Sequence, residues 1–206
     1  MKLTELLTHI VDNSELHGRF LNTLSYLENC GARLLAGCQH PTLVREEMLK
    51  HAAEEFRHAY YLKFLMRRVA TNPLDSYHRS HLLGGYPALH LLPRLNLAVS
   101  RQLVQLGYQG ATLKGVAYVL VSYAIEVRAK QLYPTYQKTL RARCPKVSIR
   151  SIIVEEEHHL AEMEKEVDAL PNGWDLAEQI CAIEQELTRA WLRAVASECK
   201  AALQLT

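Results

Sequence analysis

The stretch from Ile149 to Val167, IRSIIVEEEHHLAEMEKEV, guides the interpretation of the whole chain. Its apolar side chains recur at helical spacing, which predicts a helix with one buried stripe. Glu156 falls in the middle of this stripe, and His159 lies on its shoulder, one turn further along. Burying a lone carboxylate costs several kcal/mol, so we expect this glutamate to be protonated, paired with a cation or bound to a metal.

A helix predicted over about residues 41–72 repeats the pattern. Glu55 lies in the middle of its apolar stripe, and His58 lies at the shoulder. Chance alone gives about one Glu-x-x-His in a chain of this length and composition, so one copy would be a weak signal. Two copies on separate helices, each with its glutamate centred on the apolar face, favour a shared site.

Two further predicted helices each carry one glutamate, Glu28 and Glu126, within an apolar stripe. Because Glu28 precedes Glu55 by 27 residues and Glu126 precedes Glu156 by 30, we predict two helical hairpins of similar design. Four carboxylates and two imidazoles meeting inside a bundle would carry a large negative charge, which two divalent cations would balance. The alternative is a solvated polar seam, which does not explain four glutamates in the middle of apolar stripes.

This set of residues resembles the ligand set of the ferritin-like di-iron carboxylate superfamily, in which two helices supply one Glu each and two supply Glu-x-x-His. The matching residues are Glu28, EFRH at 55–58, Glu126 and EEHH at 156–159. Locally, EFRH and the run from Ile125 to Pro134 are most similar to the aldehyde-deformylating oxygenases. The resemblance covers about residues 14–168.

The resemblance implies a four-helix bundle with one long crossover, for which residues 73–110 are available. It also implies that Glu28 and His58 hold one iron, that Glu126 and His159 hold the other, and that Glu55 and Glu156 bridge them. The EEEHH cluster permits Glu155 and His158 as ligands instead. We prefer Glu156 and His159 because they share the apolar face of Ile149, Ile153 and Met163.

Several neighbours of Glu126 affect this hypothesis. Tyr123, one turn earlier, is the candidate catalytic residue, and Tyr133 lies two turns later; core packing is an alternative role for both. Lys130, one turn after Glu126 on nearly the same face, would either extend past the bundle end or pair with Glu126. Arg57 and Arg128 are expected on outer helix faces.

We predict an all-α, ferritin-like four-helix bundle with additional N-terminal, crossover and C-terminal helices, forming a single domain over residues 1–206. Within it, residues 14–168 form the metal-binding core, and the helix at 174–203 is a packing or dimer element. The other predicted segments are a helix at 3–12, a helix to Gly37 capped by Ser14, the helix at 41–72 that Pro73 stops, a surface connection at 73–92, a helix at 94–106, and a helix at 111–142 kinked at Pro134.

Composition narrows the classes of function. The formal charge of +2, without a basic stripe, argues against nucleic acid as a partner. Five cysteines without a CxxC pair are typical of reduced thiols in a cytoplasmic protein. No window approaches the roughly 20 apolar residues of a membrane span, so we expect none.

These observations predict a di-iron oxygenase or oxidase that activates O2 as co-substrate and oxidises a small or lipid-like organic substrate. Two Fe ions are the expected cofactor, manganese also suits oxygen and nitrogen ligands, and electrons would come from an external donor. One alternative is a ferritin- or rubrerythrin-like protein for iron handling or peroxide detoxification. Another is a non-catalytic helical interaction module with a vestigial site.

Overall fold

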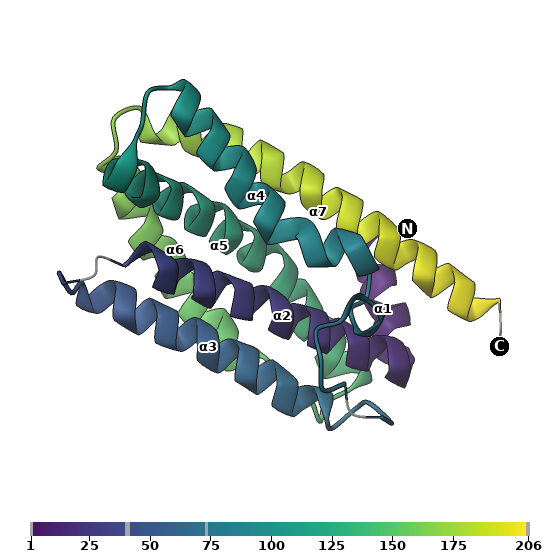
Figure 1. The fold of residues 1–206 in the computed structure, drawn as a ribbon. Coiled ribbons are helices and arrows are strands. Elements are labelled where there is room, and N and C mark those ends of the chain that lie inside the picture. Colours follow the sequence, from purple (N-terminus) through teal and green to yellow (C-terminus); the bar gives the residue numbers. More distant parts are fainter. Residues whose placement is uncertain (1, 40–41, 73, 205–206) are drawn as a thin grey trace.

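The computed structural model describes residues 2–39, 42–72 and 74–204. Within these ranges the protein is all helical and contains no strand. The α-helices, shown in Figure 1, are α1 (Leu3–Asp12), α2 (Ser14–Cys38), α3 (Glu46–Met66), α4 (Gly85–Gln105), α5 (Gly110–Arg143), α6 (Arg150–Asp168) and α7 (Gly173–Leu203), with one 3-10 helix, η1 (Arg79–His81).

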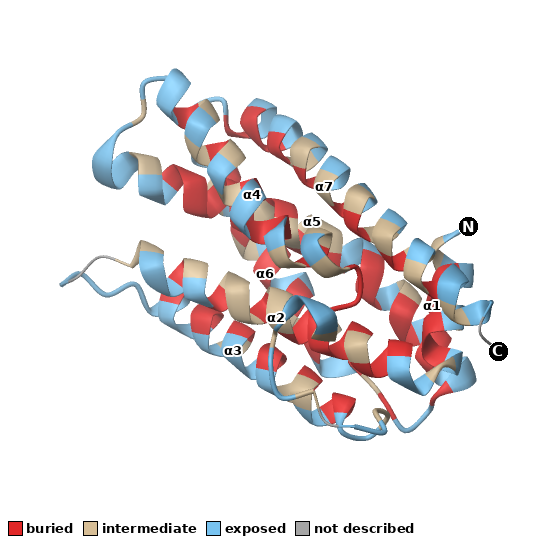
Figure 2. Cartoon of the chain, turned by 45° about the vertical axis from the view of Figure 1, so that its right-hand side comes forward, coloured by how far each residue is buried: buried red, intermediate tan, exposed pale blue. Residues whose placement is uncertain are grey.

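Two hairpins form the centre of the molecule: α2 packs along α3, and α5 packs along α6. The other helices cover them, since α4 packs on α7 and α5, and α1 contacts α5, α2 and α7. In Figure 1, α4 and α7 lie side by side on the face of the bundle away from α3. The buried residues of each helix face its neighbours (Figure 2), as the predicted apolar stripes require.

The start of α2 corrects one expectation. The cap is Asn13, not Ser14, because the Asn13 side chain accepts hydrogen bonds from the backbone N–H groups of Glu15 (3.1 Å) and Leu16 (3.0 Å). These two donors have no partner inside the helix, so an asparagine oxygen at this position stabilises the first turn.

Helix α3 is shorter than predicted at both ends. It begins at Glu46, after Arg45 in an extended conformation, and the Leu43 and Val44 side chains before it are exposed. It ends at Met66. Beyond this residue the backbone hydrogen bonds join residues three apart, such as that from Arg68 N–H to Leu65 O. Pro41 and Pro73, the predicted limits, lie outside the described residues.

The predicted surface connection at 73–92 is wrong in its second half, because α4 already begins at Gly85 and continues through Pro93. A proline inside a helix removes a hydrogen bond and costs about 3 kcal/mol. The carbonyl that Pro93 leaves free, that of Leu89, accepts a hydrogen bond from the Tyr26 hydroxyl (2.7 Å). Burial of Leu91 and Leu92, worth about 1.5–3 kcal/mol each, further offsets the cost.

Helix α5 also corrects the expectation that no segment reaches the length and hydropathy of a membrane span. One helix among the described residues, α5, has an 18-residue window with a mean hydropathy of 1.2, and half of that window is buried inside the protein. Core helices pass the same test because they are apolar on most sides. The packing of α5 against α4 and α6 accounts for its composition.

His17 on α2 makes folding stability sensitive to mild acid. Its ring is buried and lies 2.7 Å (Nε2 to Oη) from the hydroxyl of Tyr136. Burial, aided by the charge of Lys146, lowers the pKa of His17 from 6.5 to about 4. Between these values the unfolded chain binds a proton that the folded chain does not. The free energy of unfolding is therefore expected to fall by up to about 3 kcal/mol as pH falls from 6.5 to 4.

We expect His17→Gln to remove this contribution, which urea midpoints measured above pH 6.5 and near pH 4 can test. The wild type should lose more stability on acidification than His17→Gln does. His9→Gln, at an exposed position, serves as the control and should follow the wild type. Parallel pH profiles for the wild type and His17→Gln would contradict the prediction.

Candidate metal centre

Seven acidic and imidazole side chains converge inside the two hairpins, and each is at most 6% exposed. They include all six of the predicted metal ligands, and one histidine that the sequence analysis did not include. The seven are Glu28 from α2, His51, Glu55 and His58 from α3, Glu126 from α5, and Glu156 and His159 from α6.

These residues form two overlapping groups with the spacing of metal ligands. One contains Glu28, Glu55, His58 and Glu156; the other contains His51, Glu55, Glu126 and His159. Within each group the candidate ligand atoms lie within 4.8 Å of one another. The groups separate Glu28 with His58 from Glu126 with His159, as the resemblance implies, but Glu156, the second expected bridge, belongs to the first group alone. Because Glu55 belongs to both groups, it is placed to bridge two ions.

His51 is the residue that sequence reasoning missed. Its Nε2 atom lies 3.4 Å from Glu55 Oε1 and 3.3 Å from Glu126 Oε1, and its ring centre lies 4.0 Å from that of His159. The signal was present: His51 precedes Glu55 by four residues, which places both on one helix face. A search limited to Glu-x-x-His passes over it.

Outer carboxylates orient two of the histidines. His58 Nε2 is hydrogen-bonded to Glu155 Oε2 (2.7 Å), and His159 Nε2 is hydrogen-bonded to Glu54 Oε2 (2.8 Å). The Nδ1 atoms therefore face inward, His58 Nδ1 lying 3.1 Å from Glu156 Oε1 and His159 Nδ1 lying 3.3 Å from Glu55 Oε1. Histidines that bind metals are commonly held in this way, with the second ring N–H donated to a carboxylate.

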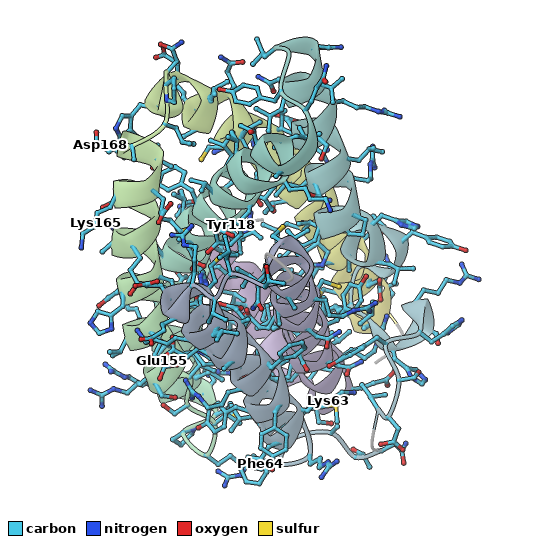
Figure 3. The ribbon with its side chains drawn as sticks, turned by 60° about the vertical axis from the view of Figure 1, so that its left-hand side comes forward. Lys63, Phe64, Tyr118, Glu155, Lys165 and Asp168 are labelled. Atoms are coloured by element: carbon cyan, nitrogen blue, oxygen red, sulfur yellow. The ribbon has the colours of Figure 1, made fainter. Side chains whose placement is uncertain are left out.

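The same contacts distinguish Glu156 and His159 from their alternatives Glu155 and His158. Glu155 lies on the outer side of α6, facing α3 (Figure 3), where it also pairs with Arg57. The His158 side chain is exposed. Glu156 and His159, in contrast, are buried within the ligand groups.

Glu155→Gln is expected to weaken metal binding without removing a ligand. The amide is a weaker acceptor for the His58 N–H than the carboxylate, so His58 is less basic and less firmly oriented. Loss of such an outer partner typically lowers metal affinity about 10- to 100-fold. Competition titrations with a chromogenic chelator would measure the change. Glu157→Gln, at an exposed position on the same helix, is the matched control and should bind as the wild type does.

Without metal, protons balance the charge of the cluster. Burial and the charges of neighbouring glutamates raise the pKa of Glu28 and of Glu126 well above the usual range. Burial opposes ionisation of Glu55 as well, but the adjacent imidazoles of His159 and His51 lower its pKa. Burial favours neutral His159, yet the carboxylates of Glu156, Glu55 and Glu54 around it raise its pKa to about 10. Metal loading must therefore release protons.

The cluster fits a metal centre because several of its buried polar atoms lack hydrogen-bond partners among the described residues. They are His51 Nδ1, Glu55 Oε1, His58 Nδ1, Glu126 Oε2, Glu156 Oε1 and His159 Nδ1. Native proteins rarely bury such atoms unsatisfied. Carboxylate oxygens and imidazole nitrogens together suit iron and manganese.

The tyrosine beside the cluster is Tyr133, whose hydroxyl donates a hydrogen bond to Glu28 Oε1. The structure does not bring the predicted catalytic residue Tyr123 to this place. Tyr123 is half-buried and packs edge-to-face against Trp174 of α7, with ring centres 5.8 Å apart. Lys130 is exposed, so it does not neutralise Glu126. We therefore assign the hydroxyl group of Tyr133, not that of Tyr123, to the candidate metal centre.

A cavity of about 50 Å³ adjoins the first ligand group. Glu28, Glu55 and Glu156 of this group line the cavity, together with residues of α4 and α7. The apolar lining residues are Leu24, Leu27, Leu91, Leu92, Ile125, Ala129, Leu132 and Trp191. Gly31 also lines the cavity, and a Cβ atom there would lie 3.7 Å from Glu55 Oε2, an ordinary van der Waals distance.

No family model matches the chain, and neither a curated protein nor a solved structure matches it. The geometry supports an all-helical protein whose buried Glu and His groups could hold metal ions. Any more specific function depends on the chemistry of these groups and of the cavity beside them.

Proposed function

We propose that this protein is a ferritin-like dimetal oxidoreductase that uses dioxygen to oxidise a small organic substrate. The observation that carries the proposal is the convergence of four buried glutamates and three buried histidines into two groups that share Glu55. Two divalent cations would balance the four carboxylates. The connection from α3 to α5, which contains α4, corresponds to the single long crossover of ferritin-like bundles.

When bound, two iron ions supply the electrons that reduce dioxygen; manganese suits the same ligands. The chain holds the ligands in place: Glu155 and Glu54 orient His58 and His159, and the Tyr133 hydroxyl donates a hydrogen bond to Glu28. The apolar side chains around the cavity exclude water from the carboxylates, which strengthens electrostatic interactions within the centre.

The two positions differ in ligand type. The group around His58 has three carboxylates and one imidazole, whereas the group around His51 and His159 has two of each. The cavity contacts three carboxylates of the first group. We infer that dioxygen and the organic substrate approach the position held by Glu28 and His58, while His51 and His159 enclose the other.

The cavity and its covering helices favour an enzyme over iron storage. Helices α4 and α7 provide a wall for a small molecule directly beside the ligands. A ferritin- or rubrerythrin-like role would require no organic substrate at this position. A vestigial, non-catalytic site is disfavoured by the six buried ligand atoms without hydrogen-bond partners in the described chain.

We also propose a cytoplasmic location, an external electron donor and no nucleic-acid partner, with a homodimer as one candidate assembly. All five cysteines are free thiols, which suits a reducing compartment. The near-neutral formal charge of +2 does not favour a polyanion.

The experiment that tests the function combines metal analysis with oxygen consumption. Protein expressed with added iron and manganese should contain about two metal ions per chain, one for each ligand group. The iron form, supplied with a chemical reductant, should consume dioxygen faster when the organic substrate is present. No metal uptake after anaerobic reconstitution would refute the proposal. Assembly into a large hollow cage, seen by light scattering, would favour storage instead.

A further inference from the structure

The ligands of the candidate metal centre are buried, so a metal ion must reach them through the surrounding wall. All seven side chains are at most 6% exposed. One cavity that touches them is the apolar one of about 50 Å³ beside Glu28, Glu55 and Glu156. Another, of about 380 Å³, touches His51 and is lined by the beginning of α3, the second half of α6 and Tyr118 of α5.

The apolar cavity does not suit a hydrated cation. A divalent cation in water holds about six water molecules, each of which takes roughly 30 Å³ in the liquid, so the hydrated ion needs roughly 180 Å³. Apart from the ligands, the charged lining residues are Arg128 and Glu184, which pair with each other and leave no net charge. The sequence-based expectation that Arg128 occupies an outer face is wrong, because α7 covers that face and the Arg128 side chain is only 14% exposed.

The larger pocket has several acidic residues in its lining. Three carboxylates contribute to it, those of Glu47 on α3 and of Glu162 and Glu166 on α6. Two basic residues also line it. Arg45 pairs with Glu166 (2.5 Å, Nη2 to Oε1), and the Lys165 side chain extends away from the bundle (Figure 3). The carboxylates of Glu47 and Glu162 are therefore left to meet a cation that enters.

Neither of these two carboxylates has a close ionic partner in the described chain. Glu47 is exposed and makes no ion pair with a described residue. Lys50 Nζ lies 3.7 Å from Glu162 Oε1, beyond hydrogen-bonding distance, and the Lys50 side chain is 55% exposed. Carboxylates that line one pocket raise the local concentration of cations and speed their entry.

His51 connects the pocket to the centre. Its side chain lines the pocket although the residue is only 2% exposed. Its Nε2 atom lies 3.4 Å from Glu55 Oε1 and 3.3 Å from Glu126 Oε1, and its Nδ1 atom is buried without a hydrogen-bond partner among the described residues. A buried, unsatisfied imidazole nitrogen is rare in native proteins, and a divalent cation would supply the missing partner. One side chain thus contacts both the pocket and two carboxylates of the second ligand group.

We propose that this pocket is the route by which divalent metal ions enter and leave the centre. Glu47 and Glu162 receive the hydrated ion, and His51 is the first buried ligand that the ion reaches. This inference rests on the proposed function, because it concerns the same metal centre. It also separates the routes: metal ions pass on the side of His51, whereas dioxygen and the organic substrate approach the first ligand group.

The test follows the uptake of Co²⁺ by the metal-free, full-length protein in a stopped-flow instrument. Co²⁺ accepts the same oxygen and nitrogen ligands, and its visible absorption changes when it binds. The pocket variant is Glu47→Gln/Glu162→Gln. The control variant, Glu46→Gln/Glu164→Gln, changes the charge by the same amount on the same two helices, at exposed residues that do not line the pocket. Release into excess chelator and the equilibrium affinity are measured for each protein.

We expect the pocket variant to take up Co²⁺ about tenfold more slowly than the wild type at low ionic strength, with a weaker dependence on salt. Release should slow by a similar factor, because the ion leaves by the route through which it enters, so the equilibrium affinity should stay within about twofold. The control variant should match the wild type in all three quantities. Glu47→Gln alone, which disturbs no ion pair, should show part of the effect.

Equal uptake rates in the pocket and control variants would overturn the route. So would slower uptake that appears only with Glu162→Gln and is accompanied by weaker affinity. That result would mean that the freed Lys50 acts on Glu54, 3.9 Å away, which orients His159. A wild type that binds no Co²⁺ at equilibrium would refute the proposed function itself. Two bound ions whose uptake does not depend on the pocket would retain the function and overturn only the route.

Discussion

Glu55→Gln is expected to abolish metal binding at both positions. Glu55 is the one residue shared by the two ligand groups, and it lies within 3.4 Å of His51 Nε2 and 3.3 Å of His159 Nδ1. The amide keeps the volume of the side chain but lacks the negative charge needed to bridge two cations. Metal content, measured by mass spectrometry after anaerobic reconstitution, should fall from about two ions per chain to nearly none.

Two comparisons make this result specific. Glu46→Gln changes an exposed carboxylate on the same helix and should leave metal content unchanged. His51→Ala removes a ligand from one group only, so this variant should keep about one ion per chain, at the position of His58. A Glu55→Gln protein that folds and retains both ions would show that Glu55 is not the bridge. Unchanged metal content in His51→Ala would remove His51 from the ligands.

Trp191→Ala is expected to have the largest effect on stability. The Trp191 side chain is fully buried, stacks on Phe20 with ring centres 6.2 Å apart, and donates a hydrogen bond from Nε1 to the Leu83 carbonyl (2.9 Å). Truncation of such an aromatic residue typically costs about 3–5 kcal/mol, because it leaves both a void and an unsatisfied carbonyl. Urea unfolding followed by circular dichroism would measure the loss.

The local backbone explains why the structure around Trp191 cannot easily collapse. Gly84, in a left-handed conformation at φ +87°, approaches the indole so closely that a Cβ atom there would lie 2.6 Å from Trp191 Cδ1. Trp174→Ala, at a side chain that is 47% exposed, is the control and should cost less than about 1 kcal/mol. Equal losses in the two variants would contradict a special role for Trp191 in joining α7 to the bundle.

Helical periodicity made much of this protein predictable. Glu28, Glu55, Glu126 and Glu156 each interrupt an apolar stripe, and burial of a stripe also buries the residues within it. The sequence therefore predicts that these carboxylates face the interior of the same bundle. Cap and turn residues predicted α1, α6 and α7 to within a few residues, since these signals act locally.

Signals that depend on distant partners could not be interpreted in this way. Pro93 suggested that a helix begins just after it, but α4 continues through this proline. The Leu89 carbonyl, which loses its helical partner at Pro93, accepts a hydrogen bond from the Tyr26 hydroxyl instead. Tyr123 and Tyr133 both lie near Glu126 in sequence, and only the position of α2 places Glu28 beside Tyr133. The contact between α5 and α2, not the sequence, therefore shows which tyrosine hydroxyl lies at the candidate metal centre.

The sequence by itself determined an all-helical chain with four inward-facing glutamates and two of the histidines beside them, because these features follow from residue spacing along single helices. Tertiary structure decided which groups of ligands form, that His51 joins them, and that Arg128 faces a cavity rather than solvent. The physical reason is that α7 covers a face of α5 that would otherwise be exposed. Whether a charge on that face is solvated or buried depends on a helix more than 40 residues further along the chain.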